Sequence, residues 1–302
     1  MRQQALAGAG RYALSIDVEE WYHTCWVGEW VDPGQRPRLV EELDRLIPST
    51  LDLLAECRAR ATFFVLGEVA RRLPDRIRQV AGAGHEVASH GDLHFRVDRW
   101  SVEEFSQQAS EAKRQLEDLT GAEVVGFRAP EWSMRRPDNP RLRALAEAGY
   151  RYDSSVSPCW GAGSHENLVD PYELSWSGTE PLLEMPPLAF GGAARLPVCG
   201  WTGRVVPPAW IARAARRRAA AGGAAVMTFH PWEIVDRPVP GEMMGLARLF
   251  HDLGRRGYRD RLAEVLARLP WMPLREAAGW SSPVIAEGGA SDRSCVEGGG
   301  AE

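Results

Sequence analysis

The chain has 302 residues, of which 44% are hydrophobic and 25% charged, and its formal net charge at pH 7 is −5. This balance is typical of globular domains and excludes the basic surface of a nucleic-acid-binding protein. No apolar run approaches the roughly 20 residues that an integral membrane helix needs. The first residues are too weakly apolar for a signal peptide, and the five cysteines form neither a CxxC pattern nor a disulfide framework, so we expect a cytoplasmic protein.

Apolar strands and amphipathic helices are predicted to alternate along most of the chain. The predicted strands are residues 12–17, 61–67, 85–88, 124–130, 150–155 and 224–232, with short candidates at 182–185 and 195–198. The predicted helices are residues 39–57, 68–81, 101–119, 141–148, 209–221 and 243–256, and Pro48 and Pro74 are expected to kink or break the first two. A loop is predicted at residues 24–37 and a looser region at 156–208. We therefore divide the chain into an N-terminal extension (1–11), one domain (12–280) and a disordered tail (281–302).

Polar side chains follow the apolar runs at their C-terminal ends. Asp17, His90, Arg128, Asp153 and His230 all occupy such positions. The alternation of strands and helices predicts a parallel sheet, and the length and number of units favour a closed or nearly closed α/β barrel. Because the carboxyl ends of the strands of a barrel meet at one mouth, we expect these five side chains to converge there.

Two histidines, His90 and His94, lie four positions apart just after one of these strands. Residues at i and i+4 of a helical or tightly turned backbone face the same way, so both imidazoles can bind one divalent metal ion. Because side chains alternate along an extended backbone, Asp17 and Glu19 point to one face and Glu20 to the other. Two histidines and one carboxylate leave an open coordination position, which is typical of a catalytic zinc site.

The same mouth contains groups that can move protons. A carboxylate that is not bound to metal can take a proton from water, His230 can protonate a leaving group, and Arg128 can keep the free carboxylate ionised. Taken singly, Arg128 could form a plain salt bridge and His230 could be a hydrogen-bonded core histidine. Taken together with the metal-binding pattern, these residues indicate metal-assisted hydrolysis of an amide.

These motifs resemble those of the polysaccharide deacetylase family, the NodB-homology enzymes of carbohydrate esterase family 4. The family's HxxxH, Arg-x-Pro, Asp-Ser and final histidine motifs match, in order, residues 89–94, 127–130, 152–155 and 229–233. The first strand, which reads Ile-Asp-Val-Glu, is similar to a branch found with exopolysaccharide and exosortase loci. The resemblance covers about residues 12–280. It implies a distorted (β/α)7 barrel and a divalent metal, Zn²⁺ above all, with Co²⁺, Ni²⁺ and Mn²⁺ as alternatives. The implied reaction is hydrolysis of the acetamide of an N-acetylated sugar in a polysaccharide or glycan precursor.

The resemblance also implies a role for each matching residue. The implied roles are general base (Asp17), orientation of that base (Arg128), metal ligation (His90 and His94), general acid (His230), tuning of that acid (Asp153) and oxyanion stabilisation by a backbone N–H (Glu131).

The sequence departs from the family pattern in two places. The family has two adjacent aspartates, the second of which binds the metal, whereas position 18 here is a valine, which cannot. The alternation of side chains makes Glu19 the better substitute ligand, with Glu20 as the alternative. Glu131 and Trp132 replace a Tyr-Gly pair of many members, which adds a carboxylate and a bulky ring near the substrate.

Two other functions stay open at this point. A same-fold hydrolase could cleave another linear or cyclic amide, as an allantoinase cleaves a cyclic ureide. An inactive module could bind glycans without turnover, and Val18 is the best support for that interpretation. Tryptophans favour a sugar partner, because indole rings pack on the C–H faces of sugars; the candidates are Trp21, Trp26, Trp30, Trp132, Trp160 and Trp201.

Overall fold

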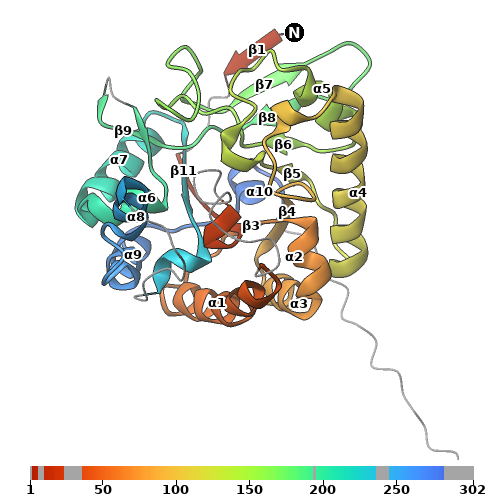
Figure 1. Cartoon of the computed structure of the whole chain (residues 1–302). Coiled ribbons are helices and arrows are strands. Elements are labelled where there is room, and N and C mark those ends of the chain that lie inside the picture. Colours follow the sequence, from red (N-terminus) through yellow and green to blue (C-terminus); the bar gives the residue numbers. More distant parts are fainter. Residues whose placement is uncertain (1, 6–9, 24–35, 193–194, 236–244, 282–302) are drawn as a thin grey trace, which may run out of the picture.

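The structure is a computed structural model that describes residues 2–5, 10–23, 36–192, 195–235 and 245–281 (Figure 1). Two predictions from the sequence fall largely outside these residues. They are the loop that carries Trp26 and Trp30, of which residues 24–35 are not described, and the disordered tail, of which residues 282–302 are not described.

Among the described residues, parallel strands in the order β11-β2-β3-β4-β5-β6-β8 form the centre of the fold. Their bounds are β2 (Arg11–Val18), β3 (Thr62–Val65), β4 (Glu86–Ser89), β5 (Gly126–Phe127), β6 (Tyr152–Asp153), β8 (Leu182–Glu184) and β11 (Ala224–Phe229). Just after β8, Pro187 forms a parallel bridge with Val226 of β11, and the N–H of Leu188 donates to the carbonyl of Val226 at 2.8 Å. The two sides of the sheet therefore meet, which confirms the predicted distorted barrel.

Most helices pack around the outside of the barrel, whereas α10 (Leu274–Ala277) packs against inward-facing side chains of the sheet (Figure 1). The longer ones are α1 (Arg36–Glu56), α3 (Pro74–Gly82), α4 (Val102–Thr120), α5 (Pro140–Glu147), α7 (Pro208–Ala220), α8 (Gly245–Asp252) and α9 (Tyr258–Leu266), and the shorter ones are α2 (Gly67–Arg72), α6 (Gly200–Val205) and α10 (Leu274–Ala277). Pro74 begins α3 and separates it from α2, as predicted. Pro48 lies inside α1, which runs on without a break. None of the helices among the described residues is both long and apolar enough to cross a bilayer.

Two antiparallel strands that the sequence did not predict extend the sheet beyond β8. They are β7 (Tyr172–Ser175), which pairs with β8, and β1 (Arg2–Ala5), which pairs with β7. β1 belongs to the segment that was assigned to an N-terminal extension. A small hairpin of β9 (Ala189–Phe190) and β10 (Leu196–Pro197) lies in the region that was predicted to be looser.

Side chains of the parallel strands alternate between two apolar clusters, one on each face of the sheet. Ala13, Phe64 and Val226 belong to a smaller cluster that also includes Leu274 of α10. Leu14, Phe63 and Met227 belong to the larger cluster, which packs against the surrounding helices. Odd-numbered positions of β2 therefore face the barrel interior, and this places Asp17 on the inside.

Candidate active site

Glu19, His90 and His94 bring their ligand atoms together at the mouth of the barrel. Oε2 of Glu19 lies 2.6 Å from Nε2 of His94 and 3.6 Å from Nε2 of His90. One ligand atom from each residue lies within 4.8 Å of the other two, and all three side chains are nearly inaccessible to solvent. Two imidazole nitrogens and one carboxylate oxygen are a donor set that fits a divalent cation such as Zn²⁺.

Local backbone geometry explains why the two histidines converge. His90 follows β4 at an inward position, two residues after Ala88, and its Nδ1 lies 2.8 Å from the carbonyl oxygen of Arg128. A carbonyl oxygen only accepts hydrogen bonds, so Nδ1 must carry the hydrogen in this contact. The lone pair of Nε2 is then available to bind a metal ion. Gly91 has a φ of 86°, a left-handed conformation that glycine adopts at little cost, and the turn it forms brings His94 back to the site.

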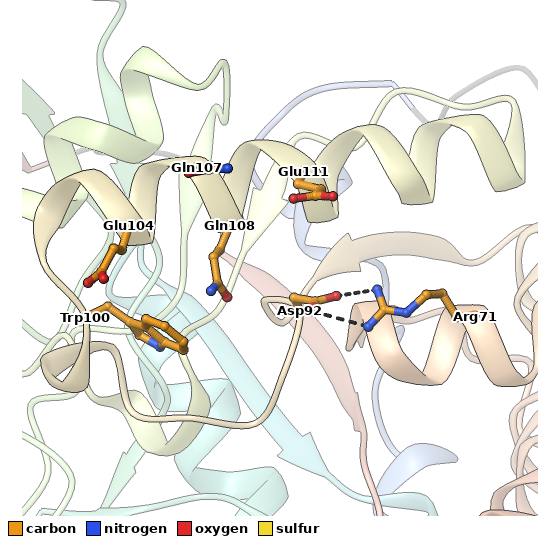
Figure 2. Close-up of a pocket in the computed structure, with 7 residues that line it drawn as sticks. All are labelled: Arg71, Asp92, Trp100, Glu104, Gln107, Gln108 and Glu111. Carbon is orange, nitrogen blue, oxygen red and sulfur yellow. Dashed lines mark hydrogen bonds and ion pairs between the residues drawn. The ribbon is translucent and has the colours of Figure 1, made fainter.

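The segment between the histidines is anchored to α2. Asp92 pairs with Arg71 at 2.5 and 3.2 Å (Figure 2). The N–H groups of Gly67 and Glu68 donate to the carbonyls of Gly91 and Asp92 at 2.9 and 3.0 Å. Arg71 and Asp92 also line a cavity of about 300 Å³ beside α4, whose other lining residues are Trp100, Glu104, Gln107, Gln108 and Glu111. These contacts hold the histidine segment in place from outside the mouth.

Glu20 lies away from this group. Its Oε1 accepts a hydrogen bond from the backbone N–H of Leu43 in α1 at 3.3 Å. Burial, and then the neighbouring Glu42 carboxylate, raise the pKa of Glu20 to about 8. Of the two carboxylates considered as the replacement for the missing aspartate, the structure therefore places Glu19 with the histidines and Glu20 elsewhere.

Arg128 binds Asp17 inside the barrel, as its predicted role requires. Its Nη1 donates to Oδ1 of Asp17 at 2.7 Å, to Oγ of Ser15 at 2.8 Å and to Oγ1 of Thr228 at 3.1 Å. Its Nη2 donates to Oγ of Ser154 at 2.9 Å. Asp17 is 6% exposed and Arg128 1%. The guanidinium is thus fixed by β2, β11 and the residue after β6, and it holds one oxygen of Asp17 in a defined position.

His230, which follows β11, directs one ring nitrogen at Glu19 and the other at Glu233. Its Nε2 lies 3.2 Å from Oε1 of Glu19, and its Nδ1 lies 3.0 Å from Oε2 of Glu233. Burial lowers the pKa of His230, but the carboxylates of Glu19 and Glu233 outweigh burial and raise that pKa to about 9. The two carboxylates therefore favour the protonated ring, which is the form that can donate a proton.

The implied contact between Asp153 and His230 is not formed among the described residues. Tyr152 belongs to the cluster inside the barrel, so alternation turns Asp153 to the other face of the sheet. There Oδ1 of Asp153 accepts a hydrogen bond from Oγ of Ser155 at 2.6 Å. Burial raises the pKa of Asp153, and burial together with repulsion from Asp153 raises the pKa of the neighbouring Glu184 well above its usual value. Glu233 takes the place beside His230 that the resemblance gave to Asp153.

Glu131 and Trp132 form a strained turn three and four residues after Arg128. Their φ angles are 57° and 50°, in a left-handed region that costs a side chain of this size about 1–3 kcal/mol. Oε2 of Glu131 lies 3.4 Å from Nη1 of Arg96. Burial lowers the pKa of His94, but Glu19 and, to a lesser degree, Glu131 outweigh it, so that the net shift is upward. Glu131 thus lies on the histidine side of the mouth.

Sequence analysis missed two residues of this site. Glu233 was inside a quoted motif but received no role, although its spacing of three from His230 is that of a capping box. His23 stacks on His94 with ring centroids 5.5 Å apart and an interplanar angle of 14°, and its Nε2 lies 3.3 Å from Oε1 of Glu68. No sequence signal marks His23, because its place depends on how the turn after β2 packs on the histidine segment.

With this geometry in view, comparison with known proteins identifies the family. Residues 36–152 match a family described as "Polysaccharide deacetylase", a segment that includes His90, His94 and Arg128. This segment belongs to the polysaccharide deacetylase family. Residues 154–279, which include His230 and Glu233, match a second family described as "Domain of unknown function (DUF3473)".

Similar proteins of known name agree with this assignment. The chain is 39% identical over 84 residues to a chitooligosaccharide deacetylase of Sinorhizobium fredii, which covers 28% of this chain and 39% of that protein. It is 28% identical over 153 residues to a peptidoglycan deacetylase of Helicobacter pylori, which covers 48% of each. The chain thus spans half or less of the length of these relatives. A crystal structure of a protein from Mycobacterium smegmatis has the same fold, with a TM-score of 0.58, 24% identity, and coverage of 94% of this chain and 99% of that one.

Proposed function

We propose that this polysaccharide deacetylase family member is a metal-dependent N-deacetylase. It would hydrolyse the acetamide of an N-acetylated sugar in a polysaccharide or a glycan precursor. The observation that carries the proposal is the meeting of Glu19, His90 and His94 at the barrel mouth, with Asp17 and His230 beside them. The two curated relatives are named for deacetylation of chitooligosaccharides and peptidoglycan, which supports an N-acetylated sugar as the substrate class.

Zn²⁺ is the cation we propose, because two neutral imidazoles and one carboxylate are ligands that zinc binds readily; Co²⁺, Ni²⁺ and Mn²⁺ are alternatives. When bound, such a cation polarises a carbonyl and lowers the pKa of water at the site. The contact of His90 with the carbonyl of Arg128 keeps its Nε2 lone pair available, and Glu19 supplies the carboxylate that Val18 cannot. Glu19 therefore supports an active enzyme over an inactive glycan-binding module.

Asp17 is the proposed general base. Nη1 of Arg128 donates to its Oδ1 at 2.7 Å, which fixes the orientation of the carboxylate that would accept a proton from the attacking water. Asp17 lies in β2, two positions before Glu19, and it is not one of the three residues whose ligand atoms come together.

His230 is the proposed general acid. Its Nε2 faces the ligand group at 3.2 Å from Oε1 of Glu19, and its ring is favoured in the protonated form. A proton given from Nε2 to the sugar nitrogen would let the amine leave as the carbon–nitrogen bond breaks. The backbone N–H of Glu131, in the strained turn at the mouth, is the proposed donor to the carbonyl oxygen as it becomes negative.

The test is release of acetate from N-acetylglucosamine oligosaccharides of graded length by zinc-loaded protein. We expect wild-type protein to release acetate and Asp17→Asn to lower kcat by about 100-fold or more, because the variant has lost the base. Asp138→Asn, which changes an exposed carboxylate outside the site, is the matched control and should keep wild-type activity. Turnover of a cyclic ureide with no acetate from any N-acetylated sugar would favour another amide as the substrate. Sugar binding without turnover would favour a binding module.

A further inference from the structure

Glu233 contacts the ring nitrogen of His230 that points away from the candidate metal ligands. Its Oε2 lies 3.0 Å from Nδ1 and also 3.0 Å from the backbone nitrogen of His230, and the side chain is 1% exposed. A carboxylate only accepts hydrogen bonds, so Nδ1 must carry the hydrogen in this contact. Nε2 is thereby the nitrogen that faces Glu19 and the mouth.

Arg204 of α6 forms an ion pair with the other oxygen of Glu233. Nε of Arg204 lies 3.4 Å from Oε1 of Glu233, and Nη1 of Arg204 donates to the carbonyl of His251 at 2.5 Å. A methyl group added at Gly200 would overlap the carboxylate of Glu233, so α6 approaches this group as closely as glycine permits. Glu233 is therefore fixed on the side of α6 as well as on the side of His230.

An aromatic stack fixes the plane of the His230 ring. The ring stacks on Trp232 with centroids 5.5 Å apart and an interplanar angle of 16°, and Trp232 stacks in turn on His251 at 4.6 Å and 22°. The guanidinium carbons of Arg204 and Arg255 each lie 5.7 Å from the centre of the Trp232 ring. Stacking restrains tilt of the imidazole, while the contact with Glu233 restrains its rotation within the ring plane.

We propose that Glu233, held by Arg204, is the positioning residue that fixes the tautomer and the orientation of His230, so that Nε2 is directed at the leaving nitrogen of the substrate. This inference rests on the proposed role of His230 as general acid. Arg204, His230 and Glu233 all lie within residues 154–279. The segment that matches a domain of unknown function therefore supplies the acid and its support to a site whose ligand histidines come from the first segment.

The test combines kinetics with ¹⁵N NMR of the histidine rings in Glu233→Gln, a variant that keeps the size of the side chain and removes its charge. We expect kcat to fall about tenfold or more, with KM within about threefold of the wild-type value. The imidazole of His230 is still present in this variant but is less well oriented. Bound metal should stay at the wild-type amount, since Glu233 contacts none of the three ligands. The Nδ1 signal of His230, assigned by its loss in His230→Asn, should move toward that of an unprotonated nitrogen.

Asp153→Asn is the control for the NMR measurement, because it alters the carboxylate that the family resemblance placed beside the acid; the His230 ring signals should not change. If Glu233→Gln does not fold, Arg204→Lys keeps the charge but has a shorter side chain, which weakens the contact with Glu233. This variant should give the same changes to a smaller degree. A kcat within about twofold of wild type, or an unchanged Nδ1 signal in a folded Glu233→Gln, would overturn the proposal. If wild-type protein releases no acetate, the proposed function fails, and the ring signals still decide whether Glu233 positions His230.

Discussion

Nη1 of Arg128 lies 2.7 Å from Oδ1 of Asp17 inside the barrel, and neither side chain has appreciable contact with solvent. Burial of an ion pair costs free energy of folding, because each charge loses its hydration. Hydroxyl groups of Ser15, Thr228 and Ser154 offset part of that cost by accepting hydrogen bonds from the same guanidinium. The pair holds the carboxylate of Asp17 in a fixed orientation, as its proposed role as general base requires.

Replacement of Arg128 should damage both stability and activity. Arg128→Met leaves the charge of Asp17 buried without a partner, so we expect the free energy of unfolding to fall by about 3–5 kcal/mol. Arg128→Lys keeps the charge but cannot donate to Asp17 and Ser154 at once, and its loss should be smaller. Urea denaturation measures both. In the double variant Asp17→Asn/Arg128→Met part of the lost stability should return; if it shows the sum of the two single losses, the pair is not coupled.

Strand alternation allowed much of the site to be predicted from the sequence. It predicted different directions for Glu19 and Glu20. The structure does separate them, although both residues follow β2 and the N–H of Glu19 donates to the carbonyl of Asp17 at 3.0 Å. The barrel was also predictable, since apolar runs and helices alternate along the chain. The matched family segment begins at position 36, after Asp17 and Glu19. The role of Asp17 came from the family resemblance, and alternation was used to choose Glu19 over Glu20.

Other parts depended on information that the sequence does not carry locally. Asp153 was placed in the mouth because it follows an apolar run, but only the register with β5 and β8 shows that Tyr152 takes the inward position. The role of Glu233 could be inferred only from the structure, which shows that α6 packs against it and that Arg204 pairs with it. β1 and β7 are four residues each and pair with one another although more than 160 positions separate them in the sequence. Local sequence patterns do not indicate a pairing over such a separation.

Acid should destabilise the protein through His85. This histidine is buried, its Nδ1 accepts a hydrogen bond from the N–H of Ala61 at 3.3 Å, and burial, helped by Arg60, lowers its pKa to about 4. The unfolded chain binds a proton near pH 6.5, so stability is fully present above that pH and is lost as pH falls toward 4. Between pH 7.5 and pH 5 the loss from this residue should be about 2 kcal/mol.

Urea denaturation of His85→Gln at these two pH values checks the assignment. The variant should lose less stability between pH 7.5 and pH 5 than wild type, with a remainder from His251, whose pKa is lowered in the same way. An equal loss in both proteins would mean that His85 does not titrate in this range when the chain unfolds.

Two glycine-to-alanine changes should have opposite signs. A Cβ at Gly126 of β5 would overlap the ring of Tyr152, which is buried and donates to Oε1 of Glu86 at 3.0 Å, so Gly126→Ala should cost about 1–3 kcal/mol. At Gly82 of α3 an added Cβ meets nothing within 4 Å, so Gly82→Ala should be neutral or stabilise the fold by up to about 1 kcal/mol. Thermal unfolding of the two variants measures the difference. A stable Gly126→Ala protein would show that the interior can shift to admit the methyl group.

The most direct test measures bound metal and acetate release on the same preparations of wild type, Glu19→Gln and Glu20→Gln. The account predicts about one divalent cation per chain in wild type and in Glu20→Gln, with acetate release proportional to bound metal, and loss of both in Glu19→Gln. Glu20→Gln is the matched control because the two carboxylates are adjacent in sequence and only Glu19 lies with the histidines. A folded Glu19→Gln that binds metal as wild type does, or acetate release by protein free of divalent metal, would contradict it.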